Sequence, residues 1–140
     1  MASEISEQLR AEVARRADYR CEYCLLHEED AGFPHQIDHV ISRKHGGSSD
    51  FDNLAYACVL CNRHKGSDVA SIDRTTGLAV RLFDPRRDRW ADHFRLDAEF
   101  IGSHTQIGAA TVRLLRLNAA ERVAERRLLQ SLGTYPLPSG

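Results

Sequence analysis

The stretch that decides the fold spans residues 21–66 and reads CEYCLLHEEDAGFPHQIDHVISRKHGGSSDFDNLAYACVLCNRHKG. It contains all four cysteines of the chain, in two C-x-x-C pairs: Cys21 with Cys24, and Cys58 with Cys61. Two such pairs are typical of a tetrahedral Zn²⁺ site, because each turn brings two thiolates to one metal. Four protein ligands leave no position for water, so we expect this zinc to be structural.

The insert between the two cysteine pairs is longer than that of an ordinary four-cysteine finger. Loop closure by a metal costs little more for a long insert than for a short one, so a second site fits inside it. A lone Asp-His pair is usually a surface pair, and a lone Asn usually belongs to a turn. Only a conjunction of several motifs inside a zinc frame favours a catalytic site over these separate interpretations. These motifs are Asp38-His39, Gly46-Gly47, Asn53-Leu54, Asn62 and Lys65-Gly66.

The combined pattern resembles that of the HNH endonucleases with a ββα-metal site. It is similar to the zinc-stabilised members in particular, which include phage enzymes that resolve branched DNA. The resemblance covers roughly residues 19–67, about a third of the chain. The motifs that carry it are Cys21-x-x-Cys24, Asp38-His39, Gly46-Gly47, Asn53-Leu54 and Cys58-x-x-Cys61-Asn62-x-x-Lys65-Gly66.

The resemblance implies a role for each matching residue of the site. His39 would be the general base that activates water, and Asp38 and Asn62 would hold a catalytic divalent ion, Mg²⁺ or Mn²⁺. Asn53 would hold the hairpin loop and orient His39. Position 62 is Asn where many family members have histidine; this known variant favours a hard, oxygen-preferring ion.

These residue types also suit the hydrolysis of a phosphodiester. A neutral imidazole can take a proton from water at about pH 7, and one Mg²⁺ held by a carboxylate and an amide keeps positions for phosphate and water. Residues 36–42 predict a strand, and strand alternation would send Asp38 and His39 to opposite faces. In the family the strand bends at the site, and the resemblance implies the same here.

We expect an α+β fold with a ββα-metal, treble-clef-like HNH core on a Cys₄ zinc site. An N-terminal helix would precede the core, and a C-terminal extension of mixed strands and helices would follow it. We expect a single domain over residues 1–140, with the core at about 19–67 and the extension at about 68–134.

Cap and stop signals predict several helix ends. Ser6 is a suitable N-cap for an amphipathic helix over residues 6–18, and Gly66 would end a short helix after the second cysteine pair. Thr105 and Asn118 would each begin a helix of the extension.

Other residues of the extension are interpreted by their type and spacing. Trp90 and Phe94 have helical spacing and are expected in the core. The arginines of the last two helices predict a solvated face; they are Arg113, Arg116, Arg122, Arg126 and Arg127.

DNA is the expected partner. Residues 1–62 carry a net charge of −5 and residues 63–140 one of +4, a modest asymmetry. Four basic residues near the motifs are expected to bind phosphates, with Lys65 the best match to the family: Arg43, Lys44, Arg63 and Lys65. No helix has the polar pattern of a base reader, so sequence specificity is not predicted. The chain has no run of apolar residues long enough for a membrane span and begins without a secretory signal, so a cytoplasmic protein is expected.

Two alternatives to a nuclease stay open at this point. One is a catalytically inactive, zinc-stabilised nucleic-acid-binding module, against which the intact Asp38, His39 and Asn62 argue. The other is a structural zinc domain that binds protein. The form of DNA, the biological role and the oligomeric state do not follow from the sequence.

Overall fold

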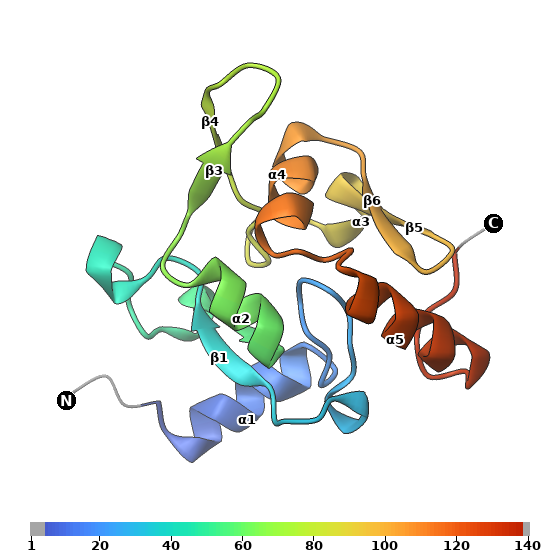
Figure 1. Cartoon of the computed structure of the whole chain (residues 1–140). Coiled ribbons are helices and arrows are strands. Elements are labelled where there is room, and N and C mark those ends of the chain that lie inside the picture. Colours follow the sequence, from blue (N-terminus) through green and yellow to red (C-terminus); the bar gives the residue numbers. More distant parts are fainter. Residues whose placement is uncertain (1–4, 139–140) are drawn as a thin grey trace.

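Five α-helices and three two-stranded antiparallel sheets make up residues 5–138, the part of the chain that the computed structural model describes (Figure 1). The helices are α1 (Glu7–Arg16), α2 (Val59–Lys65), α3 (Trp90–His93), α4 (Gln106–Leu114) and α5 (Ala120–Ser131). The strands pair as β1 (Gln36–His39) with β2 (Leu54–Ala57), β3 (Ala70–Ile72) with β4 (Ala79–Arg81), and β5 (Phe94–Asp97) with β6 (Phe100–Ser103). The α+β class is confirmed, whereas residues 1–4 and 139–140 of the expected domain lie outside the described part.

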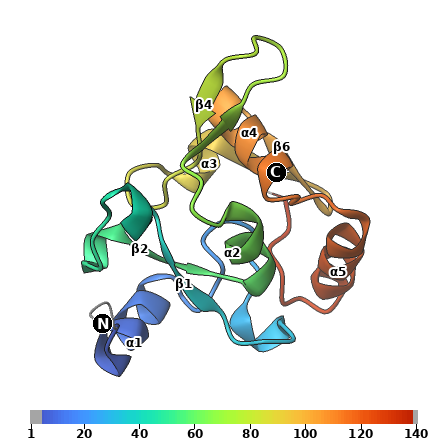
Figure 2. The same cartoon turned by 60° about the vertical axis from the view of Figure 1, so that its left-hand side comes forward.

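The β1–β2 hairpin lies between two helices, with α1 on one side and α2 on the other (Figures 1 and 2). Its antiparallel register runs from Gln36 opposite Ala57 to His39 opposite Leu54. Alternate residues of β2 face opposite sides, so this strand contributes both to a small core beneath α1, around Val13, and to the main core. A hairpin followed directly by a helix is the ββα order expected for the core.

Three of the expected helix ends are confirmed. Ser6 caps α1 by accepting a hydrogen bond from the Leu9 amide at 3.0 Å, and Gly66 is the C-cap of α2. Thr105 caps α4 by accepting from the Gly108 amide at 3.0 Å. No helix within residues 5–138 is both long and apolar enough to cross a membrane.

The first strand is shorter than the one predicted over residues 36–42, because β1 ends at His39. The Lys65 ammonium takes the carbonyl oxygens of His39 and Val40, each at 3.2 Å, and residues 43–45 form a 3₁₀ turn. The Lys65 side chain of α2 therefore binds the backbone at the point where the β1–β2 pairing ends.

The main core joins the cysteine segment to the C-terminal extension. Phe83 packs edge-on against Tyr23, with ring centroids 6.3 Å apart, and against Phe94 at 5.1 Å. Trp90 lies 5.1 Å from Phe94 and donates its indole N–H to the Tyr23 carbonyl at 2.9 Å. Phe94 is buried and Trp90 packs against the core, so this expectation is confirmed.

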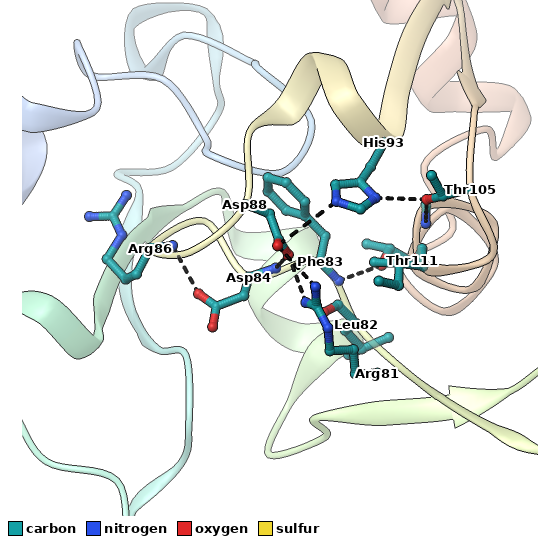
Figure 3. A network of polar contacts seen from close by, with 11 residues as sticks. Arg81, Leu82, Phe83, Asp84, Arg86, Asp88, His93, Thr105 and Thr111 are labelled. Carbon is teal, nitrogen blue, oxygen red and sulfur yellow. Dashed lines mark hydrogen bonds and ion pairs between the residues drawn. The ribbon is translucent and has the colours of Figure 1, made fainter.

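A polar network fastens the projecting β3–β4 hairpin to α3 and α4 (Figure 3). Arg81 makes a two-pronged ion pair with Asp88 through Nη1–Oδ2 and Nη2–Oδ1 contacts of 2.7 and 2.9 Å. His93 Nδ1 lies 2.7 Å from the hydroxyl of Thr105, the residue that caps α4. These contacts fix the segment that follows α2.

The expectation of a solvated arginine face on the last two helices is wrong for two of its members. Arg122 and Arg126 of α5 are 5% and 3% exposed. Each guanidinium donates to at least one backbone carbonyl: Arg122 Nη1 to Leu115 O at 2.8 Å, and Arg126 Nη2 to Leu117 O at 2.7 Å. Arginine is tolerated inside because its donors find acceptors.

Asn118 was expected to cap α5, and this is also wrong. The N-cap is Ala119, which makes no side-chain cap. The Asn118 amide instead pairs with the backbone of Ile101 on β6: Oδ1 accepts from the N–H at 2.9 Å and Nδ2 donates to the carbonyl at 2.8 Å. The Asn118 side chain therefore binds the backbone of β6 instead of capping the helix that follows it.

Candidate functional site

The four cysteines converge in one buried cluster whose sulfur atoms all lie within 4.8 Å of one another. Cys24 Sγ and Cys58 Sγ are 3.7 Å apart. Thiolates about 2.3 Å from a tetrahedral Zn²⁺ lie about 3.8 Å from each other, so the cluster fits this ion. Backbone amides already point at two sulfurs: Tyr23 N lies 3.4 Å from Cys21 Sγ, and Cys61 N lies 3.4 Å from Cys58 Sγ. Both knuckles therefore have the shape that a metal requires.

The C-terminal extension completes the surroundings of this cluster. Arg122 Nη2 donates to Cys61 Sγ at 3.1 Å and also lies 3.7 Å from Cys58 Sγ. The Tyr135 hydroxyl donates to the Cys24 carbonyl at 2.6 Å. Four thiolates on Zn²⁺ carry a net charge of about −2, which the Arg122 guanidinium partly balances. No pattern along the chain signals this role, because position 122 lies 61 residues after Cys61.

Three residues singled out from the sequence line one surface hollow of about 260 Å³: Asp38, His39 and Asn62. Asp38 and His39 come from β1, and Asn62 comes from the first turn of α2. Strand alternation does not separate the first two, because β1 has a free edge in its two-stranded sheet. Side chains from both of its faces can reach a hollow at that edge. Arg43 lines the same hollow.

Asp38 is buried, and each of its carboxylate oxygens has a partner. The Tyr23 hydroxyl donates to Oδ2 at 2.7 Å, and the Lys65 ammonium donates to Oδ1 at 3.2 Å. Burial raises the pKa of Asp38, while the Lys65 charge and the Tyr23 hydrogen bond partly offset that rise. A carboxylate held from two sides has a fixed orientation and keeps further lone pairs for a ligand.

The buried position of Lys65 does not suit a contact with a DNA phosphate. Its side chain is 2% exposed and its three donors are used on Asp38 Oδ1, His39 O and Val40 O, each at 3.2 Å. An ammonium in this position cannot reach a DNA backbone without breaking all three contacts. We therefore assign Lys65 to the shaping of β1, and we remove it from the DNA contacts expected from the sequence. Arg43, Lys44 and Arg63 are exposed.

His39 is half-buried, with Nε2 3.0 Å from the hydroxyl of Ser49. Burial lowers the pKa of His39; the Asp38 carboxylate opposes this effect, and the charges of Arg43 and Lys65 add to it. The net direction is downward, so the ring is neutral over a wider pH range than an exposed imidazole. A neutral ring has a nitrogen that can accept a proton.

Asn53 fastens the connection between β1 and β2, and its side chain makes its hydrogen bonds with Ile41 and Ser48 rather than with His39. Its Oδ1 accepts from the Ile41 amide at 3.0 Å, and its Nδ2 donates to Ile41 O at 2.9 Å and Ser48 O at 2.7 Å. Gly47 packs directly against these hydrogen-bonded groups, because a Cβ there would lie 1.7 Å from Ile41 O. The Gly-Gly motif thus has a steric cause at its second position.

Asn62 is available to an ion through its oxygen. Its Nδ2 donates to Gln36 Oε1 at 2.6 Å, which turns the amide oxygen away from that contact. One carboxylate and one amide oxygen beside one hollow are the hard donors that Mg²⁺ or Mn²⁺ prefers. Asp38 of β1 and Asn62 of α2 therefore fit such an ion.

Comparison with known proteins gives one match. The family model described as HNH endonuclease matches residues 21–68, a segment that contains both cysteine pairs, β1, β2 and α2. No curated protein and no solved structure matches the chain. The match and the buried cysteine cluster agree on the same segment, so residues 21–68 are similar to an HNH endonuclease domain.

Proposed function

We propose that the protein is a metal-dependent endonuclease that hydrolyses DNA phosphodiester bonds. One observation carries this proposal: Asp38, His39 and Asn62 line a single hollow within the segment that matches the HNH family model. A nuclease needs a base and hard metal ligands at the same phosphate, and these three side chains supply both.

Each residue of the hollow has a distinct task in the proposed reaction. A bound Mg²⁺ or Mn²⁺ would neutralise charge on the phosphate and on the leaving oxygen. Asp38 and the amide oxygen of Asn62 would hold this ion, and Lys65 and Tyr23 keep the Asp38 carboxylate in place. His39 removes the proton of the attacking water, whose oxygen forms the new bond to phosphorus while the bond from phosphorus to the leaving oxygen breaks.

The four cysteines hold a structural Zn²⁺ in this proposal, because four thiolates leave no open coordination position. Two matched cysteine knuckles that hold a metal rather than forming disulfides suit a reducing compartment, and we propose a cytoplasmic location on this ground.

A plasmid-nicking assay tests the proposed function. Zinc-loaded protein should nick supercoiled DNA with added Mg²⁺ or Mn²⁺ and should stop when EDTA is added. Tight DNA binding with no nicking by any of these ions would favour the catalytically inactive binding module. Neither binding nor nicking would favour a structural zinc domain that contacts protein.

Two exposed basic residues should contact phosphates outside the hollow. Lys44→Ala and Arg63→Ala are each expected to weaken DNA binding by a similar factor for unrelated sequences. Each should reduce the slope of log affinity against log salt by about one, because one counterion release is lost. Binding titrations at several salt concentrations measure this slope. An unchanged slope in both variants would contradict the assignment.

The pH dependence of cleavage should report His39. A base is active when deprotonated, and the pKa of His39 is lowered from an ordinary value of about 6.5. We therefore expect kcat/KM to rise with pH on the acid side of about pH 6.5 and to level off above it. The negative charge of Asp38 raises the pKa of His39. An ion held by Asp38 would neutralise that charge, and the rise in kcat/KM would then occur at lower pH. A profile that still rises above about pH 7.5 would contradict a histidine base in this environment.

A further inference from the structure

We propose that Ser49 is a positioning residue that fixes the orientation and the tautomer of His39, a role that rests on the proposed function of His39 as the base. Ser49 lies in the connection between β1 and β2, and its Oγ is 3.0 Å from His39 Nε2. A neutral imidazole has one N–H donor and one bare acceptor nitrogen. The partner at Nε2 therefore decides which nitrogen is left to accept a proton.

We assign Ser49 Oγ as the acceptor in both of its side-chain contacts. Arg43 Nη1 donates to Ser49 Oγ at 3.4 Å, and a guanidinium has donors only. The hydroxyl oxygen has two lone pairs, so it can accept from Arg43 and from a protonated His39 Nε2 together. This arrangement leaves Nδ1 bare. Since Nε2 is already occupied by Ser49, Nδ1 is also the nitrogen that is free to meet a water molecule.

The hydrogen bonds of Asn53 also hold the segment that contains Ser49. The Asn53 amide binds the carbonyl of Ser48, the residue directly before Ser49, at 2.7 Å, and it binds both backbone groups of Ile41. Asn53 thus acts on His39 through the backbone and hydroxyl of the Ser48–Ser49 segment. The orienting role that the family resemblance implies for Asn53 acquires a physical route, with Ser49 as its last member.

The neighbouring serine supplies a matched comparison. Ser48 Oγ accepts from the Asp50 amide at 3.2 Å, a local contact of an ordinary turn. A serine that only fills the turn would behave like Ser48. Ser49 differs because its hydroxyl reaches a side chain ten residues earlier.

The first test is spectroscopic and does not depend on cleavage. The sample is protein that retains zinc but has been freed of Mg²⁺ and Mn²⁺. At about pH 8, where imidazole is neutral, ¹⁵N NMR distinguishes its two tautomers. The His39 signals are assigned by difference against His39→Gln. We expect one dominant Nε2–H tautomer in the parent and in Ser48→Ala, and a mixture of tautomers in Ser49→Ala. A dominant Nδ1–H tautomer in the parent, or an unchanged spectrum in Ser49→Ala, would overturn the proposal even if the protein cuts DNA.

The second test is kinetic and uses plasmid nicking with saturating Mg²⁺. Ser49→Ala should lower kcat about 3- to 10-fold with KM within about twofold, the size expected for one lost hydrogen bond to the base. Ser49→Thr should recover most of the rate because it keeps the hydroxyl, and Ser48→Ala should match the parent. Equal losses in Ser48→Ala and Ser49→Ala would show a general loop effect and overturn the positioning role. A parent that does not cut, together with the expected tautomers, would overturn the proposed function and leave the Ser49 contact established.

Discussion

His39→Ala is expected to cut DNA about 10²–10⁴-fold more slowly than the parent while binding DNA nearly as well. The proposed task of His39 is to remove a proton from water, and this interaction matters mainly in the transition state. Its ring reaches Ser49 and is not among the four sulfur ligands, so zinc content and thermal stability should hold. Nicking rates, a binding titration and elemental analysis on one preparation measure all three quantities.

His45→Ala is the matched control, because His45 is an exposed histidine of the 3₁₀ turn that follows β1. It should nick DNA at the rate of the parent. Equal loss in both variants would point to the loop as a whole. Parental cleavage by His39→Ala would show that another group takes the proton, and the assignment of the base would then have to be abandoned.

Arg122→Met is expected to destabilise the fold by about 3–5 kcal/mol, the usual cost of removing one partner from a buried charge contact. The variant keeps the apolar stem but leaves the thiolate cluster without its cation at Cys61 Sγ, 3.1 Å away. We expect a lower Tm and faster loss of zinc to a coloured chelator. Since we propose that the whole chain forms one domain, the variant should still unfold in a single transition, and zinc should be released in that same transition.

Arg127→Met provides the comparison on the same helix. Arg127 is 73% exposed and pairs with Glu99 at the surface, a type of contact that contributes little. Its Tm and zinc retention should stay close to those of the parent. If Arg122→Met also behaves like the parent, the guanidinium contributes nothing to the zinc site, and the coupling between α5 and the cysteines is refuted.

The sequence was informative where the physical signal is local. Cysteine spacing predicts a metal cluster because each pair lies within one turn, and caps such as Ser6 and Thr105 depend on residues two or three positions away. The hairpin and the helix that follows it were accessible for the same reason, aided by a specific combined motif. The structure brings Asp38, His39 and Asn62 to one hollow, as that motif implies.

The sequence failed where a distant partner outcompetes the local one. Lys65 looked like a phosphate contact, but the buried Asp38 carboxylate and two carbonyls take its donors. Asn118 looked like a cap, but the edge of β6 takes its amide. Arg122 looked solvated because no pattern along the chain connects it to cysteines that precede it by about 60 residues. Ser49 was indistinguishable from its neighbour Ser48 until the position of His39 was known.

The contacts of Arg122 and Tyr135 with the cysteine cluster also impose an order on biosynthesis. The two knuckles are translated before the guanidinium and the phenol that enclose them. While the ribosome is still making the extension, a nascent chain has all four sulfurs but lacks the cation that balances them. We therefore expect a chain that ends before residue 122 to hold zinc less firmly than the 140-residue chain and to be cleaved more readily by proteases.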